Sequence, residues 1–180
     1  MFSSTVGVAL EVMIGSESSV SLMVSDTARW LLGEEPVELV ATASNLVDPA
    51  IGEAGDVDTA VVTMRTQSGI ICSIENSRRA VYGYDQRIEV LGSQGMLQAA
   101  NPLPTTVSCA NDKGISSDVL MDFAFSRYAE AFRRELDGFI NVLEGNAAPS
   151  PNARDGRAAL VLAEAALRSL QGGGRVEVSL

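Results

Sequence analysis

The pattern of apolar and polar positions divides the chain into a strand-rich first part and a helical last third. Over residues 1–22, apolar residues alternate with small or polar ones around a glycine–serine break, which predicts one strand and a turn. Residues 26–33 predict a short helix that ends at Gly33, because Pro36 forbids its continuation. Residues 37–44 then predict the next strand.

The middle of the chain predicts antiparallel strands. Residues 57–66 and 70–79 are rich in Val, Ile and Thr, and only a Gln-Ser-Gly turn separates them, which is typical of a hairpin. Residues 86–91 and 96–99 repeat this pattern. We expect a loop at residues 45–56, where Pro and Gly interrupt any period, and a further strand at residues 105–109.

The last third predicts two amphipathic helices. The first has apolar residues at helical spacing, namely Phe125, Tyr128, Phe132, Leu136, Phe139 and Leu143. Asn152 can cap the second, with Asp155 in its first turn, and the triple glycine at 172–174 ends it. A short strand over residues 176–180 closes the chain.

This order of elements predicts the α+β class. Strands that precede helices indicate an open, mostly antiparallel sheet with helices packed on one face. The other face would expose Val, Ile and aromatic side chains, and such a patch marks an interaction surface. We therefore expect this face to serve oligomerisation, with a homodimer or homotetramer as the product.

Composition excludes some partners. The net charge of −10 repels nucleic acid and anionic lipid, and the apolar stretch at residues 6–14 is too short to span a bilayer. We expect a cytoplasmic protein without nucleic-acid or membrane partners. Cys72 and Cys109 lie far apart in apolar, strand-like runs, so both are expected to be buried free thiols.

The chain offers little catalytic chemistry. It contains no histidine, which removes the commonest general base and the commonest zinc ligand. No Gly-x-Gly-x-x-Gly joins a strand to a helix, so no dinucleotide site is expected. The acidic cluster of Glu53, Asp56 and Asp58 matches no calcium loop, and a solvated loop is the simpler interpretation. We predict neither a metal nor a cofactor.

The segment Tyr82–Asp85 is the best candidate for a binding site. Strand alternation would place Tyr82, Tyr84 and Gln86 on one face and Asp85 with Arg87 on the other. Tyrosine hydroxyl groups on a rigid sheet suit ligands rich in hydroxyl groups. The alternative, in which both aromatic rings only pack against a neighbouring strand or subunit, stays open.

Several short motifs, in order, resemble the myo-inositol 2-dehydrogenases of the Gfo/Idh/MocA family. They are Ala28–Gly33, Asn45–Asp48, Asn76–Arg87, Gly92–Met96, Arg127–Phe132, Asp155–Ala159 and Ala163–Ala165. The resemblance covers residues 26–180, whereas residues 1–25 form a divergent N-terminal segment. It implies the family's α+β half, which closes the active site and builds oligomers, without the Rossmann half that binds NAD.

The resemblance also implies which residues matter. The family places a catalytic Asp, and a His four residues later, on the helix that leads into the Ala-Arg-Trp motif. These positions hold Ser19 and Met23 here, and neither can take or relay the proton of an alcohol. Tyr82 and Tyr84 keep family substrate-contact positions. With Asn76 and Asp85 they are the expected contacts of a polyol.

Three hypotheses follow. The first is a non-catalytic, self-associating domain derived from an oxidoreductase. The second is a module that binds a cyclitol or sugar. The third is the substrate subunit of an oxidoreductase that a separate NAD-binding chain completes in trans, which the loss of the Asp and His pair disfavours.

Overall fold

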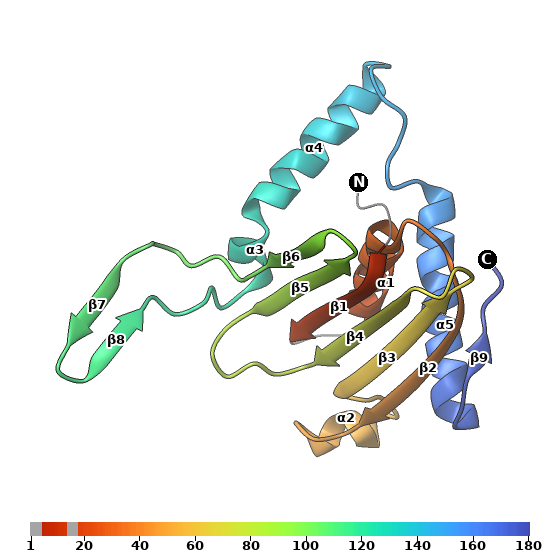
Figure 1. The fold of residues 1–180 in the computed structure, drawn as a ribbon, viewed down its shortest axis with the longest axis horizontal. Coiled ribbons are helices and arrows are strands. Elements are labelled where there is room, and N and C mark those ends of the chain that lie inside the picture. Colours follow the sequence, from red (N-terminus) through yellow and green to blue (C-terminus); the bar gives the residue numbers. More distant parts are fainter. Residues whose placement is uncertain (1–4, 14–17) are drawn as a thin grey trace.

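The computed structural model describes residues 5–13 and 18–180, and for the residues before Val24 this description is of the backbone. A seven-stranded sheet forms the centre, in the order β6-β5-β1-β4-β3-β2-β9 (Figure 1). β1 (Thr5–Met13) is parallel to β4 and antiparallel to β5, and every other neighbouring pair is antiparallel. The remaining strands are β2 (Pro36–Ser44), β3 (Thr59–Thr66), β4 (Ile71–Ser77), β5 (Asp85–Gly92), β6 (Gly95–Ala99) and β9 (Val176–Glu177).

One face of the sheet carries the hydrophobic core. Leu39 lies opposite Met64, and Met64 lies opposite Cys72, so these alternate positions form an apolar row across three strands. α1 (Ser18–Leu32) and α5 (Ala153–Gly172) pack on this face. Their contributions include Ala28, Leu32, Leu162 and Ala165, which are buried in the same cluster.

The capping box predicted for α5 is present. The Asn152 side chain accepts the Arg154 N–H at 2.8 Å, and the Asn152 N–H donates to Asp155 at 2.9 Å. Near the end of this helix Ser169 is fully buried and accepts the Ala41 N–H at 2.9 Å. Ser169 therefore bonds a backbone donor of β2 beyond the short pairing of β2 with β9.

Among the described residues, no helix covers the opposite face of the sheet. Apolar and polar side chains alternate across the strands on this face, since Val61 pairs with Glu75 and Ile71 with Arg65, whereas Leu91 pairs with Met96. The exposed apolar residues include Val40, Val61, Ile71, Leu91 and Met96. The two pairs Glu38–Arg65 and Glu89–Gln98 add polar contacts on this face.

Two segments project from this two-layer body. The first is an arm formed by β7 (Ser108–Asn111) and β8 (Gly114–Ser117), which pair only with each other. The second is α3 (Ala124–Arg127) followed by α4 (Ala129–Leu143), which runs away from the sheet (Figure 1). The fold is thus the predicted α+β arrangement of an open, mostly antiparallel sheet with helices on one face.

Several details differ from the predictions. The first helix begins at Ser18 instead of residue 26, and α2 (Pro49–Glu53) interrupts the expected loop, with Asp48 as its N-cap. The predicted strand over residues 105–109 is shifted and belongs to the arm. Cys109 is consequently exposed, so its predicted burial is wrong, whereas Cys72 is buried as predicted. The helix predicted from Phe125 to Leu143 is interrupted at Tyr128.

Candidate ligand-binding site

Polar side chains gather on the helix-bearing face where β4, β1 and β5 lie side by side. Val12 in β1 pairs with Asn76 on one side and with Gln86 on the other, so these three positions form one row. The Asn76 Oδ1 atom is buried and has no hydrogen-bond partner among the described residues. A buried acceptor of this kind costs free energy unless a water or ligand satisfies it.

Two tyrosines extend this row towards α4. Tyr128, between α3 and α4, donates its hydroxyl hydrogen to Oε1 of Gln86. Tyr84 lies edge-on to the Tyr128 ring at 5.5 Å between centroids, and its hydroxyl group lies 3.5 Å from that of Tyr128. Burial, and the contact with Tyr128, raise the pKa of Tyr84 well above its usual range. Tyr84 therefore stays a neutral hydrogen-bonding group.

Asp85 is the centre of a second network, on the other side of β5. Its side chain is buried and accepts hydrogen bonds from Tyr82 at 2.6 Å, from Arg87 at 2.9 Å, and from the Asn101 amide. Burial opposes ionisation of Asp85, but these hydrogen bonds outweigh burial and hold its pKa below the usual value. The hydrogen bond that Tyr82 donates to Asp85 raises the pKa of Tyr82.

The start of β5 and the turn before it hold the two ends of the arm. The Gln86 N–H donates to Asn101 at 2.8 Å, and the Tyr84 N–H donates to the Met121 carbonyl at 2.7 Å. Gly83 has a φ of 122°, and a Cβ atom there would lie 2.6 Å from Cβ of Leu120. Only glycine fits this close approach.

The structure thus places the predicted residues in two groups. Tyr84 lies with Gln86, as alternation predicted, but Tyr82 reaches Asp85 instead. The reason is that β5 begins at Asp85, so the residues before it follow the turn at Gly83 and do not alternate. Asn76 joins the Gln86 row from another strand. Ser19 and Met23 belong to α1, which packs on this face.

Sequence reasoning did not place Tyr128 in the site. It treated Tyr128 as part of the apolar stripe of one long helix, and the break between α3 and α4 lets its hydroxyl group reach Gln86 instead. Arg127 lies over the Tyr128 ring at 5.4 Å, and its Nε atom is buried without a partner among the described residues. The spacing gave no signal of this break, because Phe125, Tyr128 and Phe132 keep helical spacing across it.

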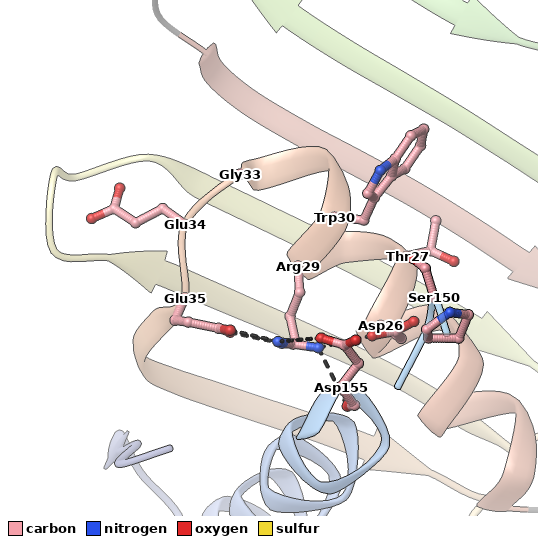
Figure 2. Close-up of a pocket in the computed structure, with 10 residues that line it drawn as sticks. Asp26, Thr27, Arg29, Trp30, Gly33, Glu34, Glu35, Ser150 and Asp155 are labelled. Carbon is pink, nitrogen blue, oxygen red and sulfur yellow. Dashed lines mark hydrogen bonds and ion pairs between the residues drawn. The ribbon is translucent and has the colours of Figure 1, made fainter. Parts of the chain in front are cut away.

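A surface pocket of about 480 Å³ lies elsewhere, at the C-terminal end of α1 and the start of α5 (Figure 2). Its centre is Arg29, which donates to Glu35 at 2.7 Å and to Asp26 at 2.8 Å and lies 3.5 Å from Asp155. Glu34, also in the lining, accepts hydrogen bonds from Ser68. These four carboxylates all have partners in the chain itself. The ion pair of Arg29 with Asp155 links α1 to α5, and the described lining of this pocket offers no free charged group.

Of the acidic cluster in the sequence, Glu53 and Asp56 are exposed, but Asp58 is structural, so the solvated-loop interpretation is wrong for Asp58. Asp58 is buried and accepts backbone N–H groups of Leu46, Val47 and Asp48 at 2.8 to 3.0 Å. Burial opposes its ionisation, but the three backbone donors outweigh it and lower the pKa of Asp58 to about 2. Among residues 5–13 and 18–180, no group of His, Cys, Asp or Glu side chains is arranged to hold a metal ion.

Comparison with known proteins places this arrangement in a family. Residues 24–98 match the model of the GFO/IDH/MocA C-terminal domain. The chain carries a Gfo/Idh/MocA C-terminal domain. It is 50% identical over 145 residues to an inositol 2-dehydrogenase of Rhizobium meliloti, and 47% identical over 146 residues to a myo-inositol 2-dehydrogenase of Thermotoga maritima. Each match covers 81% of this chain and 44% of the relative.

Solved structures of the family share the whole fold. A myo-inositol dehydrogenase from Corynebacterium glutamicum superposes with a TM-score of 0.90 at 33% identity, over 98% of this chain and 57% of that chain. The Gfo/Idh/MocA domain described here therefore spans about half the length of the relatives that it matches. Among its described residues, no helix has the length and apolar character needed to cross a membrane.

Proposed function

We propose that this Gfo/Idh/MocA C-terminal domain is a non-catalytic, self-associating domain, in which two or more copies bury the helix-free faces of their sheets against each other. The observation that carries the proposal is the set of exposed apolar side chains on this face, namely Val40, Val61, Ile71, Leu91 and Met96. Exposed apolar side chains distributed over a sheet face favour a partner over water.

The proposed domain is non-catalytic because of the residue types at two positions of α1. Ser19 and Met23 stand where the sequence resemblance implies an Asp and a His. A serine hydroxyl group has no tendency to accept a proton at neutral pH unless a base activates it, and a thioether does not exchange protons. Among its described side chains, the candidate site thus retains hydrogen-bonding groups, Asn76, Gln86 and Tyr84, without a general base.

The proposal is tested by the oligomeric mass of Val61→Arg. Val61 lies in the middle of the helix-free face, so a charged side chain there must lose its hydration when two sheets meet. We expect light scattering after gel filtration to show a smaller assembly for Val61→Arg at micromolar concentration. Leu46→Arg is the matched control, because Leu46 is exposed in a loop outside the sheet. A monomeric wild-type protein would contradict the proposal.

A second function, cyclitol or sugar binding, is favoured by one observation. The row of Asn76 and Gln86 offers several polar groups on a rigid sheet, namely the two tyrosine hydroxyl groups and the Asn76 Oδ1 atom, which is unpaired within the part of the chain that the structure describes. A polyol could donate to Asn76 and exchange hydrogen bonds with Gln86. The carboxylate of Asp85 is buried among its own donors, so Tyr82 and Arg87 are accessible members of that network.

Calorimetry with myo-inositol and scyllo-inositol tests this second function. We expect millimolar binding to the wild-type protein and at least a tenfold loss for Asn76→Ala, because the variant removes the unpaired acceptor. Glu53→Gln, in the exposed part of α2, is the control that should bind as the wild type does. The absence of both heat and a thermal shift in the wild-type protein would eliminate the idea.

A further inference from the structure

The projecting helix α4 exposes an apolar stripe along its whole length. Its members are Phe132, Leu136, Phe139 and Leu143, with exposed fractions of 46%, 59%, 58% and 70%. No residue of α4 is buried, and no other described helix or strand packs along it. A helix with such a stripe gains stability when another surface covers it.

The spacing of the stripe indicates what kind of surface that is. Its residues are separated by four, three and four positions, which is the spacing of one seam in a pair of helices packed at a shallow angle. The stripe, with the exposed Ile140 beside it, lies on one side of a helix of about 22 Å, estimated from a rise of 1.5 Å per residue. A second helix of similar length therefore fits the stripe better than a broad sheet face does.

The charges of α3 and α4 indicate the direction of that helix. The first half, up to Arg134, carries Arg127, Arg133 and Arg134 with Glu130 as its single acid. The second half carries only acidic charged residues, Glu135, Asp137 and Glu144. Two parallel copies would bring like charges together, whereas two antiparallel copies place the basic half of each beside the acidic half of the other.

We propose that α4 pairs with α4 of a second copy in an antiparallel helix pair. In an antiparallel pair, Phe132 lies opposite Leu143 of the second copy, and Leu136 lies opposite its Phe139. Each opposed pair therefore combines one aromatic and one aliphatic side chain. This contact is separate from the helix-free sheet face and does not depend on it. A single helix pair is small for a protein interface, so we expect micromolar affinity.

Pairwise disulfide formation tests both the contact and its direction. In a Cys109→Ser background, which removes the exposed thiol, Phe132→Cys and Leu143→Cys chains are mixed and incubated in a glutathione redox buffer. Antiparallel pairing places these positions against each other, within disulfide reach. We expect at least tenfold more covalent mixed dimer than with Arg134→Cys and Asn141→Cys, the matched pair on the opposite face of α4.

Equal amounts of covalent dimer from both pairs, or none from either, would overturn the proposal. Preferential linkage within the Phe132→Cys chains alone would also overturn it, because it indicates parallel pairing. An occupant other than a second copy, such as the part of the relatives' length that this chain does not span, predicts no covalent dimer.

Oligomeric mass separates this contact from the sheet-face association. Leu136→Glu should weaken the α4 contact at least tenfold and leave the sheet-face assembly intact, while Val61→Arg should do the reverse. Only the double variant should be monomeric at micromolar concentration. A Leu136→Glu mass equal to that of the wild type removes the α4 pair without affecting the sheet-face proposal.

Discussion

The hydrogen-bond network of Asp85 supports a quantitative prediction about stability. Replacing Asp85 by Asn keeps the shape but removes the charge and turns one acceptor atom into a donor. That donor then faces side chains that also donate, namely Tyr82, Arg87 and Asn101. Hydrogen bonds to a charged group contribute about 1.5–3 kcal/mol each. Arg87 is partly exposed and can turn to water, so we expect a net loss of about 2 kcal/mol.

The loss depends on pH in a defined direction. The pKa of Asp85 is lower in the folded protein than the value of about 3.9 in an unfolded chain. The stabilisation is therefore fully present above that unfolded value and disappears as the pH falls through the folded pKa. Asn does not titrate, so the wild-type protein should lose its advantage over Asp85→Asn below about pH 4.

Thermal unfolding followed by circular dichroism measures this effect. For a domain of this size, 2 kcal/mol corresponds to a decrease in Tm of about 4–8 °C at pH 7. Asp112→Asn, at an exposed carboxylate in the turn between β7 and β8, should change Tm by less than about 1 °C. An Asp85→Asn difference as large at pH 3 as at pH 7 would refute the assignment of the effect to the carboxylate charge.

Two further substitutions test the packing of α5. Leu162→Ala should cost about 3 kcal/mol in urea unfolding, because Leu162 is 1% exposed in the core, whereas Leu160→Ala on the same helix, at 48% exposed, should cost less than about 1 kcal/mol; similar losses would mean that α5 does not cover the sheet in solution. Ser169→Ala should cost about 1–3 kcal/mol, because it leaves the Ala41 N–H without its acceptor, and Ser116→Ala in the exposed arm serves as its control. An unchanged midpoint for Ser169→Ala would show that water replaces the lost bond.

Local sequence patterns were sufficient for the elements whose determinants lie close together in the chain. The β3–β4 hairpin needs only two β-branched runs and the turn at residues 67–69, and the start of α5 needs only Asn152 and Asp155. Residues 24–98 also carry enough local motifs to show the family. The hairpin turn, the helix cap and each single motif depend on residues within a few positions of one another.

The site depended on contacts that no local pattern contains. Asn76 shares a row with Gln86 only because β1 lies between β4 and β5, an order that hairpin patterns do not indicate. Tyr128 meets Gln86 because the break between α3 and α4 lets its hydroxyl group reach β5. Cys109 occupies a strand, as expected, but that strand belongs to an exposed arm, so its local pattern gave the wrong burial. Burial is a property of what packs against a strand, not of the strand itself.

The sequence by itself therefore determined the α+β class, most element positions and the absence of histidine chemistry, because these follow from composition and short-range periodicity. Only the tertiary structure decided that Tyr82 bonds Asp85, that Tyr84 and Gln86 hold the two ends of the arm, and that the apolar stripe of α4 is exposed. These features arise from chain segments brought together from distant positions, and strand order and helix docking, which place them, are set by the packing of the whole core.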